Sequence, residues 1–150
     1  MDFKAINATD VAKCIVSKCI WRNKPINNLT LQNLLYYVQL ESIRHGFYAF
    51  EDDFEAWQFG PVIPAVYYRF CGFGANPIWY DYEFNVMDKD LMEIIDNVIE
   101  KKSGLMIWDY HNELQGPDSA HASVYKPGKG DRYEISKHLI KKQAMTKNYF

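Results

Sequence analysis

The stretch Phe54–Phe70 reads FEAWQFGPVIPAVYYRF and decides how the middle of the chain folds. Gly60-Pro61 interrupts any preceding element, and a proline suits the first helical position, where its missing N–H costs nothing. Pro64 would still lie in the first helical turn, where N–H groups have no partner inside the helix. The apolar residues that follow the break fall at helical spacing: Ile63, Val66, Tyr67 and Phe70. The pattern predicts one short helix that starts at Pro61 and ends at Gly72 to Gly74.

Apolar residues also recur at helical spacing on both sides of this stretch, behind residues that can cap a helix. Further helices are predicted to start at Thr9, Thr30, Asp88 and Ser136, the second of them ending at His45-Gly46. Another short helix is predicted over 103–114, followed by a long loop over 115–132. Residues 47–50 and 78–86 are candidate strands. The predicted fold class is mainly α: a compact single-domain helical bundle over 1–150, with about six helices and one or two short strands.

The composition supports one globular domain and excludes several other classes. The chain has 150 residues, of which 48% are apolar and 16% aromatic, so disorder and coiled coil are excluded. Its longest uncharged stretches, 25–40 and 56–68, are too short to cross a membrane. The first residues lack the basic start and apolar run of a signal peptide. The three cysteines form no CxxC pair, so we expect buried free thiols in a cytoplasmic protein.

We find no sequence pattern of an enzyme, and we expect no metal and no cofactor. The four histidines form neither HExxH nor zinc-finger spacing with cysteine. No GxSxG or phosphate-binding glycine loop occurs, and Cys71 follows an apolar helix, where a buried thiol is the expected state. Direct DNA binding would need a basic domain, whereas the net charge is −2. Basic residues gather only from Lys126 onward, so an alternative function is a regulator that binds DNA through the basic C-terminal helix.

Recognition of another protein is the function class that fits the aromatic residues best. Rings cluster in and after the Gly-Pro stretch, and aromatic residues with arginine are typical of interface centres. The cluster comprises Trp57, Phe59, Tyr67, Tyr68, Trp79, Tyr80 and Tyr82, with Arg69 among them. The same rings could instead form the core of an aromatic-rich helical domain, and composition leaves both interpretations open.

Three ordered motifs resemble the Panacea family, the SocA-like antitoxin domain that is also found in phage-associated proteins. The stretch 29–37, LTLQNLLYY, is similar to the family's LKLQKLLYF, and 10–13, DVAK, to its first helix. The stretch 54–67, FEAWQFGPVIPAVY, is similar to FEAWKYGPVVPEVY and includes both prolines. In the C-terminal third, His111 falls at a family histidine, but Ala120-His121 stands where the family has Pro-Trp.

The resemblance implies a non-enzymatic antitoxin that neutralises a cognate toxin by direct protein–protein contact. Some family members are described as adaptors that present the toxin to a cellular protease, and many members are encoded in prophages. The implied partner is therefore a toxin protein, with a protease as a further partner; we expect neither nucleic acid nor membrane. The candidate interface consists of the motif residues and the two histidines: Trp57, Gly60, Pro61, Val62, Pro64, Tyr67, Tyr68, Arg69, His111 and His121.

Overall fold

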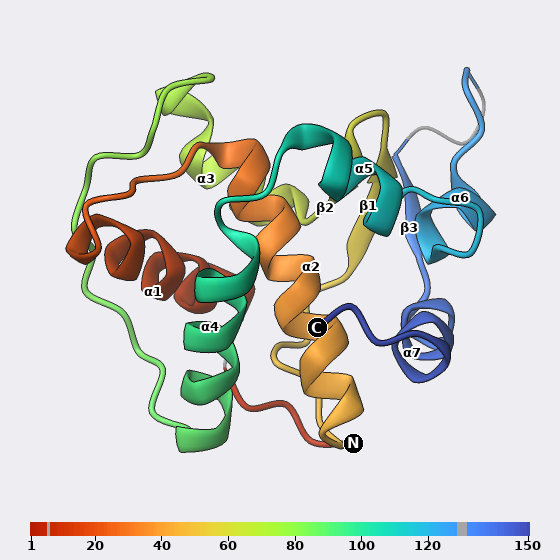
Figure 1. The fold of residues 1–150 in the computed structure, drawn as a ribbon, viewed down its shortest axis with the longest axis horizontal. Helices are drawn as coiled ribbons and strands as arrows, with labels where there is room; N and C mark the ends of the chain where they lie inside the picture. Colours follow the sequence, from red (N-terminus) through yellow and green to blue (C-terminus); the bar gives the residue numbers. More distant parts are fainter. Residues whose placement is uncertain (6, 129–131) are drawn as a thin grey trace.

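The central element of the computed structural model is the helix α2 (Asn28–Arg44), in which every residue from Leu31 to Leu40 is buried. The structure describes residues 1–5, 7–128 and 132–150. In Figure 1, α2 runs through the middle of the molecule, between two groups of elements that both pack on it. A helix that is apolar on nearly all sides requires this position, because each face needs a partner to exclude water.

The helices α1 (Ala8–Trp21) and α4 (Lys89–Lys102) cover one side of α2, and α3 (Pro64–Phe70) packs near its start. On the other side lie α5 (Ile107–Leu114), α6 (Ala120–Val124), α7 (Lys137–Thr146) and a small sheet. The sheet has the order β2-β1-β3, with β1 (Phe54–Trp57) between β2 (Gly60–Val62) and β3 (Tyr133–Ile135), both antiparallel to it. The prediction of a mainly α fold is confirmed.

The helix predicted to start at Pro61 is wrong at its beginning. Residues 54–62 form a hairpin instead: Trp57 pairs with Gly60 across the two-residue turn Gln58-Phe59, and α3 begins only at Pro64. Gly60 has φ +129°, which an L side chain rarely adopts. Pro61 lies in β2 at the edge of the sheet, where a missing N–H is tolerated. The hairpin is completed by β3, a strand from far along the chain that local periodicity cannot reveal.

The predictions for helix caps, strands and the long loop are confirmed in part and wrong in part. Asp88 and Ser136 cap α4 and α7 as predicted, whereas α1 and α2 are capped by Asn7 and Asn27, whose side chains accept from Asp10 N and Thr30 N. Neither candidate strand exists: residues 47–50 form only an isolated bridge to Phe3, and 78–86 are irregular. The predicted loop 115–132 contains α6 and, outside the described residues, positions 129–131.

Candidate protein-binding surface

Two side chains from the C-terminal third of the chain, those of His121 and Gln115, hydrogen-bond to the hairpin at its turn, Gln58-Phe59. His121 Nε2 donates to the Trp57 carbonyl at 2.6 Å, and Gln115 Nε2 donates to the Gln58 carbonyl at 3.1 Å. His111 Nδ1 in turn lies 3.2 Å from Gln115 Oε1. Of the two predicted histidines, His121 therefore contacts the hairpin backbone directly, whereas His111 contacts it only through the Gln115 side chain.

His121 is buried in this contact, and burial lowers the pKa of its imidazole. The hydrogen bond to Trp57 opposes this decrease, and the field of His111 adds to it. A carbonyl oxygen only accepts, so Nε2 carries the proton of the neutral ring. The ring also stacks on Tyr125, with 5.2 Å between centroids. These contacts give His121 a structural position beneath the hairpin.

Two mostly apolar hollows flank the Phe59 side chain. The first, here called the α5 hollow, has a volume of about 330 Å³ and is lined by Leu29, Asn33, Phe59, Ile107, Trp108 and Tyr110, among others. The second, the β2 hollow, has about 220 Å³ and is lined by Leu29, Trp57, Phe59, Val62, Tyr67 and Arg132, among others. Leu29, Gln58 and Phe59 line both hollows, so the two hollows adjoin each other, with the Phe59 side chain between them.

The rings around the hollows are unusually exposed for their size. Phe59 is 67% exposed and Trp108 is 70% exposed, and Ile107 beside it is 62% exposed. Asp109 Oδ2 accepts from Met106 N at 3.1 Å at the start of α5, which fixes the turn from which Ile107 and Trp108 project. Clustered exposed aromatic side chains mark interaction sites rather than random surface, because solvent exposure of such area is unfavourable.

Trp57 forms the wall of the β2 hollow and is half-buried. Its ring centroid lies 4.9 Å from that of Tyr67 and 6.2 Å from that of Tyr68, and the Arg132 guanidinium lies over it at 4.3 Å. Its Nε1 donates to Glu55 Oε1 at 2.9 Å. Trp57 thus both packs on the motif and presents one side to the hollow.

The structure brings only part of the predicted site together. Trp57, Val62 and Tyr67 line the β2 hollow and His111 lines the α5 hollow. Gly60 and Pro61 lie in β2 and Pro64 starts α3, so these three residues shape the backbone. His121 is buried beneath the hairpin. Tyr68 is exposed beside Trp57, whereas Arg69 points elsewhere, over Phe70 and Tyr82.

Several residues of the surface are absent from the predicted interface: Leu29, Asn33, Phe59, Ile107, Trp108 and Arg132. Phe59 was visible as part of the aromatic cluster, and the apolar pair Ile107-Trp108 beside the acidic Asp109 was the available signal for α5. Nothing local distinguishes Asn33 from other residues of the buried helix.

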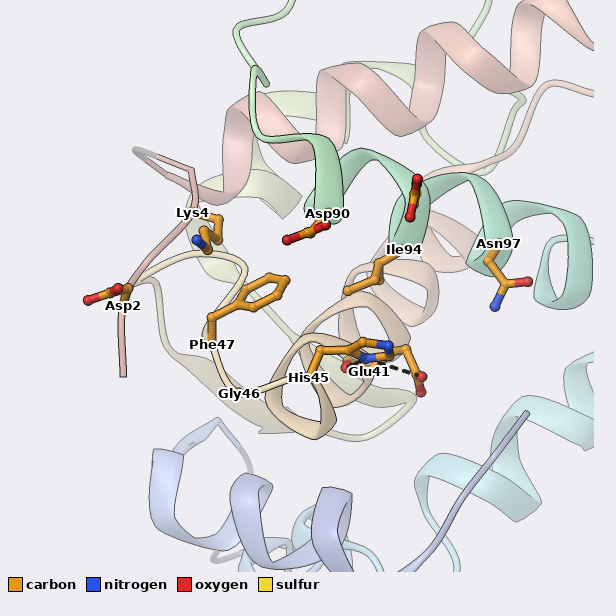
Figure 2. Close-up of a pocket in the computed structure, with 10 residues that line it drawn as sticks. Asp2, Lys4, Glu41, His45, Gly46, Phe47, Asp90, Ile94 and Asn97 are labelled. Carbon is orange, nitrogen blue, oxygen red and sulfur yellow. Dashed lines mark hydrogen bonds and ion pairs between the residues drawn. The ribbon is translucent and has the colours of Figure 1, made fainter.

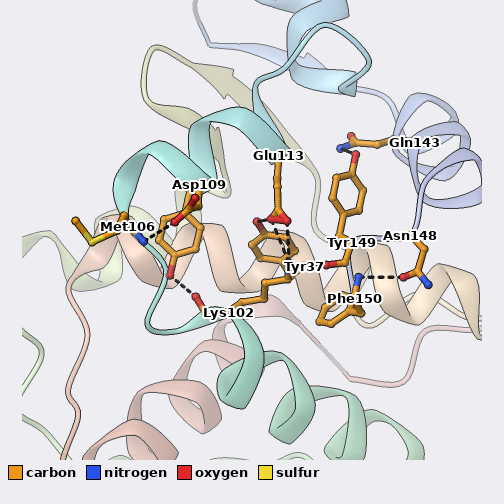
Figure 3. A network of polar contacts seen from close by, with 10 residues as sticks. Tyr37, Lys102, Met106, Asp109, Glu113, Gln143, Asn148, Tyr149 and Phe150 are labelled. Carbon is orange, nitrogen blue, oxygen red and sulfur yellow. Dashed lines mark hydrogen bonds and ion pairs between the residues drawn. The ribbon is translucent and has the colours of Figure 1, made fainter.

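A polar network behind the α5 hollow holds α5 against α2 and α4 (Figure 3). Lys102 Nζ lies 2.8 Å from Glu113 Oε1, and Tyr37 OH donates to Glu113 Oε2 at 2.6 Å. Lys102 also donates to the Tyr149 carbonyl and lies over the rings of Tyr37 and Phe150. Burial, together with the hydrogen bond to Glu113, raises the pKa of Tyr37 far above its usual value. The network explains why Lys102 can be buried: its charge is paired on several sides.

A larger hollow of about 610 Å³ lies apart from this surface and contains none of the predicted site residues (Figure 2). It is lined by charged groups from three segments, including Lys4, Glu41 and Asp90. The Glu41 carboxylate lies 3.5 Å from His45 Nδ1 and 3.9 Å from Arg44 Nε. Within residues 1–5, 7–128 and 132–150, no group of three His, Cys, Asp or Glu side chains is placed to hold a metal ion.

The cysteines differ from one another in burial. Cys14 and Cys19 are buried as predicted, and burial raises the pKa of their thiols to about 12 and about 11. The prediction of a buried Cys71 is wrong, because α3 ends at Phe70 and the following 3₁₀ turn, Cys71–Phe73, lies at the surface. Cys71 Sγ donates to the Tyr68 carbonyl at 3.1 Å. None of the helices described is long and apolar enough to span a membrane.

Comparison with known proteins finds a family model and a curated relative that match this chain. Residues 31–113 match the model of the Antitoxin SocA-like, Panacea domain family; they run from α2 to the end of α5 and include the hairpin. The chain is 36% identical over 84 residues to Antitoxin SocA of Caulobacter vibrioides (strain NA1000 / CB15N). That alignment covers 51% of this chain and only 42% of the relative. No solved structure matches. Because the family model matches more than half of its residues, the chain belongs to the SocA-like Panacea domain family.

Proposed function

We propose that this chain is an antitoxin that binds a cognate toxin protein directly through the two hollows around Phe59, and neutralises it without catalysing a reaction. The observation that carries the proposal is the exposed apolar surface around Phe59 and Trp108, two residues inside the segment that matches the family. The name of its curated relative, an antitoxin, supports the same role. A toxin bound here would bury Phe59 and Trp108, and interface centres typically contain such rings.

We further propose that the chain acts in the cytoplasm, in a phage-associated gene pair. Presentation of the bound toxin to a cellular protease is compatible with the same contact, because an adaptor must also hold the toxin. Depletion of the protease separates the two routes: growth rescue that survives depletion indicates direct neutralisation, whereas lost rescue indicates delivery.

The proposal is tested by growth rescue with the product of the adjacent gene. That product is expressed from an inducible promoter, alone or with this chain, and we expect it to stop growth only when it is expressed alone. The double variant Phe59→Ala/Trp108→Ala should lose rescue while its melting curve stays close to that of the wild type. Trp79→Ala is the matched control, because Trp79 is 62% exposed but lines neither hollow.

Two results would contradict the proposal. One is a toxic neighbour whose effect the wild-type chain does not relieve. The other is full rescue by the double variant, which would move the contact away from the hollows.

The alternative function, DNA binding through α7, has its own test. Lys141 and Lys142 are exposed on this helix, whereas Lys137 pairs with Asp53. Even non-specific binders shift DNA at about 50 mM salt and micromolar protein, so a gel shift under these conditions decides the question. A salt-dependent shift that Lys141→Gln/Lys142→Gln abolishes would favour the regulator over the antitoxin.

A further inference from the structure

The carboxamide of Asn33 is an unusual polar group at the floor of the α5 hollow. Asn33 is only 4% exposed, yet its carboxamide makes no hydrogen bond to any described residue. The neighbouring Gln32 is satisfied on both sides, since its Oε1 accepts from Ile63 N and its Nε2 donates to Asn28. The described polar side-chain atoms that are fully buried without a partner belong to Glu41 and Ser42, so the Asn33 amide keeps some contact with solvent through the hollow that it lines. Asn33 therefore offers one donor and one acceptor to a group that enters the hollow.

Arg132 supplies the charge of the adjoining β2 hollow. Among the described residues that line the two hollows it carries the only full charge, and its guanidinium lies 4.3 Å from the Trp57 ring. Its φ is +66°, a conformation that is uncommon for residues other than glycine and asparagine. Its backbone N–H donates to the Ala56 carbonyl, which fixes this strained residue directly before β3. Strain of this kind persists where the surroundings impose it, and it is concentrated at binding sites.

The volumes and arrangement of the two hollows indicate which kind of ligand fits them. Small-molecule pockets have volumes of about 300–1,000 Å³ and enclose most of their ligand. Here volumes of about 330 and 220 Å³ lie on either side of the exposed Phe59. Two separate apolar hollows fit two side chains of one peptide better than one compact ligand. An amide between them fits the peptide backbone, and a cation at one end fits a carboxylate.

We infer that the hollows bind one segment of the partner protein that carries two apolar side chains, placed on either side of Phe59, and an Asp or Glu that pairs with Arg132. Asn33 hydrogen-bonds the backbone of this segment. That the partner is a toxin rests on the proposed function. The chemistry of the bound segment rests only on the residues that line the hollows. Arg132 lies outside the residues that match the family model, so membership of the family does not itself imply an acidic partner segment.

The test uses a phage-displayed library of random dodecapeptides, selected on the purified full chain. Selected sequences should share two apolar or aromatic residues and at least one acid. Synthetic peptides of these sequences are then titrated against the wild type and three single variants. Arg132→Gln should weaken binding about tenfold, since close charge pairs across an interface contribute about that much or more. Asn33→Ala should weaken it about threefold to tenfold through the lost hydrogen bond.

Arg69→Gln is the matched control, because Arg69 is an exposed arginine over aromatic rings that lines neither hollow, and it should leave the affinity unchanged. Charge reversal gives a readout that general damage to the fold cannot produce. Arg132→Glu should reject the acidic peptide and bind the same peptide with lysine at the acidic position.

Several outcomes would overturn the inference. These are a library without binders, binders without an acid, an affinity that is independent of Arg132 and Asn33, or no recovery on charge reversal. A dimer of the wild-type chain that Phe59→Ala/Trp108→Ala dissociates would assign the hollows to a second copy instead. A toxin that is neutralised equally by wild type and Arg132→Gln would refute the acidic segment and leave the antitoxin function standing. Peptide binding as expected, together with the absence of any toxin that the chain neutralises, would refute the antitoxin function and leave the acidic segment standing.

Discussion

Trp57 shows at the scale of one residue how a family motif can serve packing and binding together. Its ring lies between Tyr67, Tyr68 and Arg132, and its carbonyl accepts from His121. The sequence alone could not choose between core and interface for this ring, because exposure depends on the hairpin and on Arg132, 75 positions away. Its half-buried ring packs on Tyr67 and Tyr68, and under the proposed function its exposed side contacts the toxin.

Truncation of Trp57 should therefore cost less than truncation of a fully buried ring. Full burial would predict a loss of about 3–5 kcal/mol for Trp57→Ala, and we expect about 2 kcal/mol in the free energy of unfolding. Urea titration measures this loss, with Phe59→Ala as the comparison, for which we expect less than about 0.5 kcal/mol. Equal losses for the two variants would show that Trp57 does not anchor the motif.

His121 should make the stability depend on pH. Its pKa in the folded chain is lowered from 6.5, the value of the unfolded chain, so the unfolded state binds the proton more readily. The contribution of the neutral ring is thus fully present above pH 6.5 and is lost as the pH falls through the folded pKa. Between about pH 7 and pH 5, the free energy of unfolding of the wild type should fall more than that of His121→Gln. Parallel pH profiles would rule out His121 as the cause.

At the scale of elements, the parts that could be predicted are those with local causes. The cap of α4 by Asp88, its apolar stripe and the glycine after it all lie within one stretch, and they agree with the structure. The hairpin of β1 and β2 could not be predicted in the same way, because β1 pairs with β3 from the far end of the chain. Pro61 fits a helix start and an edge strand equally well, and tertiary pairing placed it in β2, whereas Pro64 starts α3.

The network of α5, α4 and α2 gives a prediction for an element as a whole. Glu113→Ala should destabilise the chain by about 3 kcal/mol, because it leaves the buried Lys102 charge without its carboxylate. Lys102→Met should cost less, about 1 kcal/mol, since Glu113 is 26% exposed and keeps the Tyr37 hydrogen bond. Chemical unfolding of both variants and of the double variant measures the coupling. A larger loss for Lys102→Met would mean that the cation stabilises mainly through its ring contacts.

At the scale of the whole molecule, the helical class follows from the sequence, whereas the proposed binding surface does not. Helical periodicity identifies α2 as central, since nearly all its faces are apolar. The surface combines α2, the hairpin, α3, α5 and Arg132 just before β3, five parts of the chain that folding brings together. Residues such as Asn33 and Trp108 acquire a role there because of what they lie beside.

Calorimetric titration of the purified toxin partner with this chain and with Phe59→Ala/Trp108→Ala addresses that surface directly. Aromatic side chains at binding hot spots each contribute about 2 kcal/mol, so the double variant should lose about 4 kcal/mol and bind about 700-fold more weakly. Its thermal unfolding should stay near that of the wild type, and Trp79→Ala should bind within about threefold of the wild type. A double variant that binds the toxin as tightly as the wild type would contradict the assignment of these hollows as the binding surface.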